Sequence, residues 1–587
     1  MQPQPVHQAL LLPVSNMRRF ALLFLAVLFL VACNNAPPPS PTVTSAPIGP
    51  PATFTSPPPT PPPPPLPTAI PSLLVQGTDG LPWWNDTVFY EVFVRSFYDS
   101  NGDGIGDLNG LIEKLDYLND GDPTTTTDLG ITGIWLMPIM KATSYHGYDV
   151  EDYYQVSPEY GSNDDFRRLM EEAHARGIRV IVDLVLNHTS VENPWFIAAK
   201  DPNSDKRDWY IWSDTDPGYR GPDGQIVWHR SASGYYYGVF WSGMPDLNYE
   251  NLDVTAQMED ATRFWLEDMR VDGFRLDAIK HMVEQGKAQE NTPATHDWLQ
   301  AYHSFYKSIR ADAFTVGEAW TSTQQVLKYT GDEVDIAFQF DLALAALNSA
   351  DSGFGIQVGK EQQAVVSSFP PGQYAIFLAN HDQNRLLTQL DGDENKGRVA
   401  ASWLLTSPGV PFLYYGEEIG MQGKKPDEDI RRPMQWDGSS YRAGFTTGRP
   451  WRVPANDYPE RNVAQQNDNP GSLLNHYRRL IQLRHEHPAL RVGDWQPVDT
   501  NSPRVYAFVR QSAAEAVLVI INFGDDADEK YRLTLESGTL PPTASLTLLM
   551  GEPDPAPLTI HAQGGFDEYQ PYASLPSFST TIIQLTP

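Results

Sequence analysis

The chain has 587 residues, 41% of them hydrophobic, so it is long enough for two or three domains with substantial cores. Its 73 Asp and Glu residues outnumber its 42 Lys and Arg residues, and the resulting net charge of -31 argues against a nucleic acid as the partner. The single cysteine excludes an intrachain disulfide bond.

The first 33 residues have the pattern of an export signal. Two arginines follow Met17, an almost wholly apolar run covers residues 20–32, and Cys33 closes the segment. This run is too short to span a bilayer. Its end, Leu30-Val-Ala-Cys33, resembles the lipobox of bacterial lipoproteins, which implies cleavage before Cys33 and lipidation of its thiol. We therefore expect residues 1–33 to be a lipoprotein signal, with Met17 as an alternative start, and the mature protein to be extracytoplasmic and lipid-anchored to a bacterial membrane or cell surface.

Residues 34–78 are rich in Pro, Thr and Ser and include an unbroken run of prolines at 61–65. Such a tract has too few apolar side chains for a core and favours the extended polyproline II conformation. We expect a disordered, semi-rigid linker between the lipid anchor and the folded protein.

From residue 79 onward, short apolar runs alternate with segments of helical length. Eight such runs predict an α/β fold, a (β/α)8 TIM barrel, built from residues 79–192 and 252–490. Active sites of such barrels lie at the C-terminal ends of the strands. The expected strands cover residues 88–94, 131–136, 180–186, 273–276, 314–316, 336–340, 374–378 and 410–414.

Two segments depart from the alternation of strands and helices. Residues 193–251 follow the third expected strand and are rich in Trp, Tyr, Gly and Asp, so we interpret them as an inserted subdomain, domain B, over the cleft. Residues 491–587 contain alternating strand patterns, for example at 504–509 and 516–521, which predict a C-terminal antiparallel β-sandwich.

Three of the apolar runs end on a carboxylate: Asp277, Glu318 and Asp382. Arg275 precedes Asp277 by two residues and shares its face of the strand, so its guanidinium would keep Asp277 ionised. Glu318 lies in a largely apolar stretch, which would raise its pKa. One ionised and one protonated carboxyl are what a retaining glycosidase needs, with Asp382 as a third acid that contacts sugar hydroxyls and stabilises the transition state.

Four short segments, taken together, resemble the four characteristic regions of the α-amylase family of glycoside hydrolases, family 13, in the right order. They are Asp183-Leu-Val-Leu-Asn-His188, Gly273-Phe-Arg-Leu-Asp277, Gly317-Glu318 and Asn380-His-Asp382. The resemblance implies that Asp277 is the nucleophile, Glu318 the acid/base and Asp382 the transition-state stabiliser. It also implies that the subsite of the sugar whose bond breaks is lined by His146, Tyr148, His188, Arg275 and His381.

A second motif, residues 99–107, has the spacing of a calcium loop. Oxygen ligands occur at positions 1, 3, 5, 7 and 9, and Gly104 at position 6 permits a sharp turn. Gly110 at position 12 excludes an EF-hand, and the loop is similar to the calcium loop after the first barrel strand in the oligo-1,6-glucosidase and neopullulanase branches of the family. We expect a stabilising Ca²⁺ with no part in bond cleavage, held by Asp99, Asn101, Asp103, the backbone carbonyl of Ile105, and Asp107.

The specificity motifs are mixed. Met244-Pro-Asp-Leu-Asn248 resembles the fifth region of neopullulanases and of amylases intermediate between them and oligo-1,6-glucosidases. Lys280 and His281 resemble the Lys-His pair of α-amylases on the leaving-group side, and Ala278 replaces the Val that accompanies α-1,6 specificity. These features favour a bacterial α-amylase that cleaves α-1,4 bonds in starch, glycogen or maltooligosaccharides. We expect a monomer, because the Pro-rich tether leads into the barrel without a neopullulanase-type dimerisation domain.

Other functions remain open from the sequence. Within the hydrolases, the alternatives are a cyclomaltodextrinase, a neopullulanase or an α-glucosidase. A trehalose-forming transglycosylase would share every catalytic residue. A different class of function, a non-catalytic glucan-binding or transporter-associated barrel, is disfavoured because all three carboxylates are present together with Arg275 and the histidines.

Overall fold

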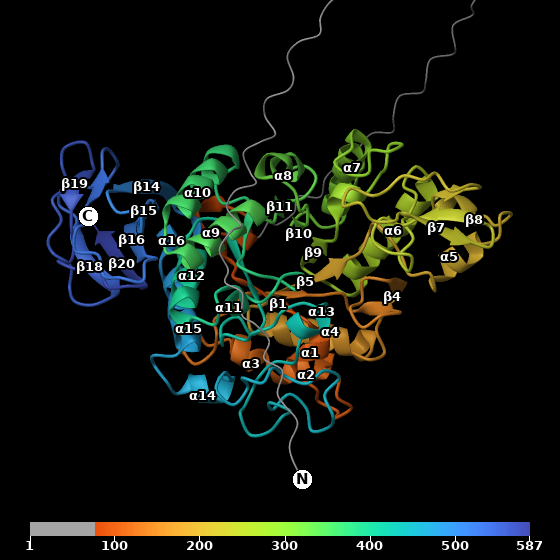
Figure 1. Ribbon diagram of the computed structural model, residues 1–587, viewed down its shortest axis with the longest axis horizontal. Coiled ribbons are helices and arrows are strands. Elements are labelled where there is room, and N and C mark those ends of the chain that lie inside the picture. The colour runs from red at the N-terminus through yellow and green to blue at the C-terminus, as the bar shows by residue number, and fades with distance from the viewer. Residues whose placement is uncertain (1–76, 587) are drawn as a thin grey trace, which may run out of the picture. The chain divides into compact units, whose positions relative to one another are not determined.

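The computed structural model describes residues 77–586. Within them, eight parallel strands form one sheet in the order β11-β10-β9-β5-β2-β1-β13-β12. Figure 1 labels β1, β5, β9, β10 and β11 of this sheet in the central part of the molecule. A parallel bridge between Phe338, just after β11, and Ala375 in β12 joins the two edges, which closes the barrel. The predicted TIM barrel is thereby confirmed. Its strands are β1 (Phe89–Val92), β2 (Gly133–Leu136), β5 (Arg179–Leu184), β9 (Gly273–Leu276), β10 (Phe314–Gly317), β11 (Ile336–Ala337), β12 (Ala375–Ile376) and β13 (Val410–Tyr414).

Helices connect and surround these strands, as a parallel sheet requires, because each crossover must return the chain to the same end. Several begin with a side-chain cap; Ser162 and Asp165, for example, form a reciprocal capping box at α4. The helices are α1 (Val94–Phe97), α2 (Leu108–Glu113), α3 (Leu115–Leu118), α4 (Asn163–Ala175), α6 (Leu252–Arg263), α7 (Pro293–Ile309), α8 (Thr323–Tyr329), α9 (Phe340–Ser352), α10 (Ile356–Ser368), α11 (Leu386–Gln389), α12 (Glu394–Thr406), α13 (Asp427–Ile430), α14 (Val463–Asn467), α15 (Leu473–Glu486) and α16 (Pro488–Val492).

Aromatic rings pack together on the barrel strands. Phe89 stacks on Phe412 with ring centroids 4.6 Å apart and on Phe314 at 5.3 Å, and all three side chains are buried. Phe338 and Trp135 extend this cluster, with centroids 5.5 Å apart. Offset and edge-to-face aromatic pairs add about 0.5–1.5 kcal/mol each beyond the burial of their area. The cluster makes a rigid base for the side chains at the strand ends.

Two small sheets lie in the connections around the third barrel strand. A hairpin of β3 (Met140–Ala142) and β4 (Val150–Val156), which the sequence analysis does not anticipate, follows β2. The segment after β5 contains α5 (Pro194–Ala199) and a three-stranded sheet in the order β6-β8-β7, coloured yellow in Figure 1. These strands are β6 (Trp212–Ser213), β7 (Trp228–Ser231) and β8 (Gly234–Tyr237).

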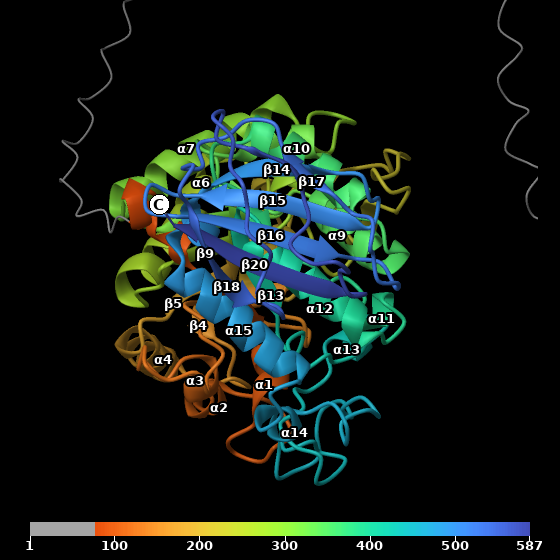
Figure 2. The ribbon, with the colours of Figure 1, turned by 90° about the vertical axis from the view of Figure 1, so that its left-hand side faces the viewer.

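The C-terminal region forms an antiparallel β domain, as predicted. Seven strands pair in the order β18-β20-β16-β15-β14-β17-β19, and Figure 2 shows β14, β15, β16, β20 and β18 side by side. On β15, Val505, Ala507 and Val509 face the core of this domain, while Tyr506 and Phe508 belong to the main core. The strands are β14 (Asp494–Thr500), β15 (Val505–Gln511), β16 (Ala516–Asn522), β17 (Leu533–Leu535), β18 (Ser545–Met550), β19 (Phe566–Tyr569) and β20 (Ser579–Thr586).

Candidate active site

The three predicted acids follow the C-terminal ends of three barrel strands, of which β9 and β10 are neighbours and β12 lies on the far side of β11. Asp277 directly follows β9, Glu318 directly follows β10, and Asp382 lies six residues beyond β12. Strands β9 and β10 are paired in register, Gly317 opposite Leu276, which places the two following carboxyls next to each other. The fold therefore brings together side chains that are far apart in the sequence.

Arg275 on β9 links the carboxyls. Its guanidinium, 1% exposed, donates a 2.6 Å hydrogen bond from Nη1 to Asp277 Oδ1 and a 2.7 Å bond from Nη2 to Glu318 Oε2. Nη1 also contacts both oxygens of Asp183 on β5, at 2.8 and 3.0 Å. One cation thus holds three carboxyl groups in fixed positions, as the planar fork of an arginine permits.

The backbone after the strand also orients Glu318. Ala278 adopts a left-handed conformation with φ of 50°, and its N–H donates a 3.1 Å hydrogen bond to Glu318 Oε2. A non-glycine residue in this region stores local strain, which is typical of functional sites. Within residues 77–586, the hydrogen bonds to the Glu318 carboxyl all reach Oε2, so Oε1 is the atom free to exchange a proton with a ligand.

Asp382 lies in a second ionic group. Arg431 donates a 2.9 Å hydrogen bond to its Oδ1, and His381 Nε2 is 3.2 Å from its Oδ2. On the other side of the ring, His381 Nδ1 is 2.5 Å from Glu91 Oε1 on β1, and both side chains are buried. His381 therefore lies between two carboxylates, an environment that favours its protonated form.

The residues predicted for the sugar subsite surround this centre. The Tyr148 hydroxyl donates to Asp183 Oδ2 at 3.0 Å and lies 2.6 Å from His381 Nε2. His146 accepts a backbone N–H from Tyr148 on its Nδ1, and the two rings stack with centroids 6.0 Å apart. His188, which follows β5, is buried, and its Nε2 has no hydrogen-bond partner within the described residues, so it is available to a ligand.

The pair of basic residues expected to contact the leaving group lies just after β9. Lys280 Nζ forms a 2.7 Å ion pair with Glu290. His281 Nδ1 lies 2.8 Å from the carbonyl of Gln289, which fixes its ring. Phe240 from the inserted subdomain is 43% exposed and contacts the rings of both His188 and His281, with centroids 5.3 and 5.5 Å away. The sequence analysis does not identify Phe240, because nothing in its local pattern marks it.

Burial dominates the acid–base properties of the site. It raises the pKa of Glu318 against the attraction of Arg275, with further increases from Asp277 and Asp382. It also raises the pKa of Asp277, since burial and the nearby Asp382 together outweigh Arg275. Arg275 thus favours the ionised form of Asp277, as expected, but burial outweighs it. The pKa of Glu318 is raised, as expected, although its setting is ionic rather than largely apolar.

The pKa values of the other charged groups at the site are also strongly shifted. Burial raises the pKa of Asp183 to about 7, although Arg275 opposes it. Burial would raise the pKa of Asp382, but His381 and Arg431 hold it well below its ordinary range. Burial lowers the pKa of His381, whereas Asp382 and Glu91 raise it to about 10. Near neutral pH, Asp382 is therefore ionised and His381 protonated.

The predicted calcium loop is a compact turn between α1 and α2. Asp99 and Asp107 are buried, and Asp99 accepts backbone N–H groups from Asn101, Gly102 and Gly104. Asp103 Oδ1 accepts the N–H of Ile105. No three His, Cys, Asp or Glu side chains within residues 77–586 have an arrangement that could hold a metal ion. The loop also offers the Asn101 amide oxygen and the Ile105 carbonyl, hard oxygen donors of the kind that Ca²⁺ prefers.

Three functional contacts have only weak signals in the sequence. Glu91 is a lone acid in the apolar run 88–94, Asp183 lies inside a strand, and Arg431 comes from a loop far downstream. A buried charge in an apolar run must have a partner, and this is the one signal that could have identified Glu91. The predicted lipidation site, Cys33, lies outside the described residues. In the part of the chain that the structure covers, no helix has the length and apolar character needed to cross a membrane.

Comparison with known proteins agrees with this geometry. Residues 91–493 match the model of the alpha amylase catalytic domain, and residues 495–540 match that of the alpha amylase C-terminal all-beta domain. The chain is 40% identical to alpha-amylase 3 of Dictyoglomus thermophilum, over 75% of this chain and 85% of that one. It is 36% identical to a trehalose synthase/amylase of Mycobacterium tuberculosis, over 76% of this chain and 80% of the relative.

A solved structure gives the same assignment. The crystal structure of an alpha-amylase from H. orenii is similar with a TM-score of 0.73 and 42% identity, covering 85% of this chain and 99% of that chain. The match extends over the barrel that carries Arg275 and its three carboxyl partners. The chain therefore belongs to the alpha-amylase family of glycoside hydrolases, family 13.

Proposed function

We propose that the protein is an endo-acting α-amylase that cleaves α-1,4-glucosidic bonds in starch, glycogen or maltooligosaccharides with retention of configuration. The observation that carries the proposal is the bridge from the Arg275 guanidinium to both Asp277 and Glu318. It keeps the two carboxyls close together, as the spacing of about 5 Å in retaining glycosidases requires.

In the first step, Asp277 attacks the anomeric carbon through Oδ2, the oxygen that Arg275 does not bind. Glu318 donates its proton to the glycosidic oxygen, so the bond to the leaving sugar breaks and a covalent glucosyl-Asp277 intermediate forms. Glu318 is suited to carry this proton because burial raises its pKa and both hydrogen bonds to its carboxyl reach Oε2, which leaves Oε1 to hold and donate the proton.

In the second step, the ionised Glu318 takes a proton from water, whose oxygen attacks the anomeric carbon and releases Asp277. Two displacements at the same carbon restore the original configuration. Asp382 remains ionised throughout, since His381 and Arg431 lower its pKa. Its negative charge is suited to contact sugar hydroxyls and to stabilise the positive charge that develops on the ring in both transition states.

Action on long α-1,4-glucans is supported by the residues around the cleft. Lys280 and His281 would contact the sugar beyond the scissile bond, and contacts with Glu290 and the Gln289 carbonyl hold their side chains in place. The chain is also similar to alpha-amylase 3 of D. thermophilum over most of its length. A monomeric, extracytoplasmic enzyme anchored through lipidated Cys33 is part of the same proposal.

We further propose that the loop at 99–107 binds a structural Ca²⁺. The donor chemistry fits calcium, because Asp99, Asn101, Asp103, the carbonyl of Ile105, and Asp107 offer hard oxygen atoms. The three acids do not form a preassembled metal cluster, so binding would require their side chains to turn toward the ion. The ion would brace this loop against residues 446–451, because Thr446 donates to Asp99 and the Trp451 N–H donates to the Gly104 carbonyl.

The product profile from soluble starch and cyclodextrin tests the proposal, with Asp277→Asn as the inactive control. An endo-α-amylase lowers iodine staining rapidly and releases mixed maltooligosaccharides, and the substitution abolishes both effects. Preferential opening of cyclodextrin would instead indicate a cyclomaltodextrinase or neopullulanase, and release of glucose alone an α-glucosidase.

The second candidate function is trehalose formation from maltose. It is favoured by the similarity to the trehalose synthase/amylase of M. tuberculosis over 76% of this chain. In that reaction a sugar hydroxyl replaces water in the second step, with the same catalytic residues. Incubation with maltose and chromatographic detection of trehalose distinguishes the two, since a hydrolase yields glucose and no trehalose.

A further inference from the structure

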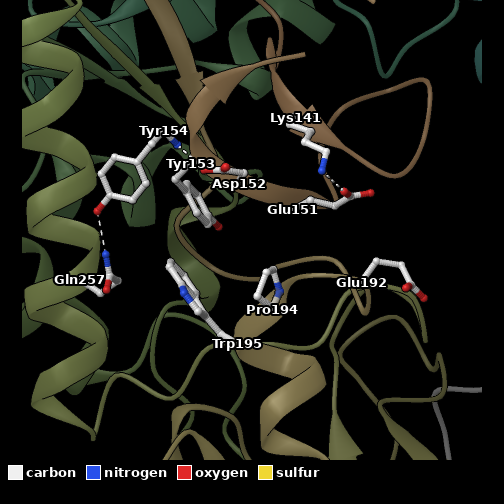
Figure 3. Close-up of a pocket in the computed structure, with 9 residues that line it drawn as sticks. All are labelled: Lys141, Glu151, Asp152, Tyr153, Tyr154, Glu192, Pro194, Trp195 and Gln257. Atoms are coloured by element: carbon white, nitrogen blue, oxygen red, sulfur yellow. Dashed lines mark hydrogen bonds and ion pairs between the residues drawn. The ribbon is translucent and has the colours of Figure 1, made fainter. Parts of the chain in front are cut away.

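A pocket of about 300 Å³ opens where the β3–β4 hairpin meets α5 and α6. Figure 3 shows its side chains converging from these elements. Its volume is at the lower end of the range for small-molecule sites. Its lining consists of Lys141, Glu151, Asp152, Tyr153, Tyr154, Glu192, Pro194, Trp195 and Gln257.

Aromatic rings form one wall of the pocket. Trp195, in the first turn of α5, stacks on Tyr153 with ring centroids 5.5 Å apart and planes 8° apart. Trp209 packs against the edge of the same indole at 5.2 Å, which fixes its orientation. Trp195 and Tyr154 are both half-buried, so part of each ring remains accessible at the wall. Such surfaces attract the C–H faces of sugar rings, whose weak positive charge complements the aromatic quadrupole.

Polar groups face this wall. Glu151 is held by a 3.1 Å ion pair with Lys141, and Asp152 accepts the N–H of Tyr154. Gln257 from α6 donates a 2.7 Å hydrogen bond to the Tyr154 hydroxyl. The pocket thus presents fixed acceptors and donors beside aromatic surface, the combination that orients a polyhydroxylated ligand.

The charge of the pocket limits what it binds. Three carboxylates against one ammonium give a negative balance, which disfavours phosphates and other anions. The carboxylates do not form a metal site, because no acidic or histidine cluster of that geometry exists within residues 77–586. An uncharged ligand rich in hydroxyl groups satisfies both conditions.

We propose that this pocket is a second carbohydrate-binding site, which holds one or two glucosyl units of an α-glucan outside the catalytic cleft. The proposal rests on the proposed function, since it takes the accessory ligand to be a segment of the same polymer. A polymer bound at the pocket raises the local concentration of its other segments near the cleft.

The pocket and the catalytic cleft share one structural element, the end of β5. The Tyr153 hydroxyl, beneath Trp195, donates to the carbonyl oxygens of Val185 and His188 at 2.9 and 3.0 Å. His188 contributes its ring to the predicted sugar subsite. These two hydrogen bonds tie the aromatic wall of the pocket to the backbone segment that carries His188.

The proposal is tested by the adsorption of the purified full chain to starch granules. Adsorption is measured for wild type, Trp195→Ala, Asp152→Asn and the matched control Ile197→Ala. Ile197 lies on α5 and is exposed but does not line the pocket. We expect adsorption to weaken about three- to tenfold for Trp195→Ala, from the loss of stacking, and less for Asp152→Asn. Because Trp195→Ala also removes packing, Asp152→Asn provides the readout that does not depend on the fold.

Hydrolysis of a short chromogenic maltooligosaccharide is measured in parallel, as it separates this proposal from the proposed function. We expect kcat/KM on this substrate to be unchanged in Asp152→Asn and Ile197→Ala. Adsorption equal to wild type in both pocket variants would overturn the accessory site while leaving the catalytic proposal intact. Absence of hydrolysis by the wild type would instead overturn the proposed function.

Discussion

Glu91 is expected to help keep His381 at the active site protonated. Its carboxylate lies 2.5 Å from His381 Nδ1, both side chains are at most 2% exposed, and Glu91 and Asp382 together raise the pKa of His381 to about 10. Substitution Glu91→Gln keeps a carbonyl acceptor of the same shape and removes the charge. The pKa of His381 in the variant should therefore fall back toward 6.5.

The size of the effect follows from the pKa shift. At about 1.4 kcal/mol per pKa unit, a rise from 6.5 to about 10 corresponds to about 5 kcal/mol of stabilisation. Asp382 is the larger contributor, so we assign about 2 kcal/mol to Glu91. Because the folded pKa is above the unfolded value, this stabilisation is complete below about pH 6.5 and is lost as the pH rises through about 10.

Urea unfolding of wild type and Glu91→Gln between pH 5.5 and 10 measures this difference. The matched control is Glu159→Gln, which removes a 2.7 Å ion pair with Arg95 whose glutamate is 50% exposed. Its cost should stay below about 1 kcal/mol. Equal stability of wild type and Glu91→Gln at pH 6, or a difference that does not shrink toward pH 10, would refute the role assigned to Glu91.

Three further predictions concern the acid, the loop and the C-terminal domain. Glu318→Gln should lower kcat about 10²- to 10⁴-fold on starch but less on substrates with a good leaving group, which need no proton; an equal loss on both would contradict an acid role. Gly104→Ala should lower the melting temperature and reduce its change on adding EDTA, because the new Cβ would clash with the Arg449 carbonyl oxygen. Gly218→Ala is the matched control, since Gly218 also has a positive φ but has open space around it; equal melting temperatures of the two variants would contradict the prediction. Arg510→Met should lower the free energy of unfolding in urea by about 3 kcal/mol, because four hydrogen bonds to buried carbonyl oxygens are lost. The control is Arg504→Met, at a residue paired with an exposed aspartate, and an equally small loss in both variants would argue against the prediction.

The barrel could be predicted from the sequence because its strands are buried on both faces. Such strands are continuous apolar runs rather than alternating patterns, and each of the eight runs overlaps an observed strand. Their lengths were harder to predict. The runs at 336–340 and 374–378 contain strands of only two residues, β11 and β12, because hydrogen-bond pairing rather than hydrophobicity ends a strand.

The β3–β4 hairpin was not predicted. Its second strand contains Glu151, Asp152 and Gln155, so it has neither the apolar run of a buried strand nor a regular alternation of apolar and polar residues. Its partner has only three residues. A hairpin of this kind is stabilised by what it packs against, here Trp195 and the end of β5, and local sequence contains little of that information.

For the site, residue types at strand ends were sufficient to find the acids but not to assign their ionisation. The sequence places Arg275 beside Asp277, two residues apart on one strand. It does not show that the same guanidinium reaches Glu318 on β10 and Asp183 on β5. Those contacts depend on the register between three strands, and they change the electrostatic environment of Glu318 from apolar to ionic.

The balance of charges explains why these acids cannot be treated singly. Burial prevents water from screening the groups, so each carboxyl responds to every other one. The cations are fewer than the carboxyls, which favours retention of a proton on one acid and leaves a negative potential for the cationic transition state. Removal of any one cation would shift several pKa values at once, so the pH dependence belongs to the whole cluster. Its carboxyl groups are Glu91, Asp183, Asp277, Glu318 and Asp382, and its cations are Arg275, protonated His381 and Arg431.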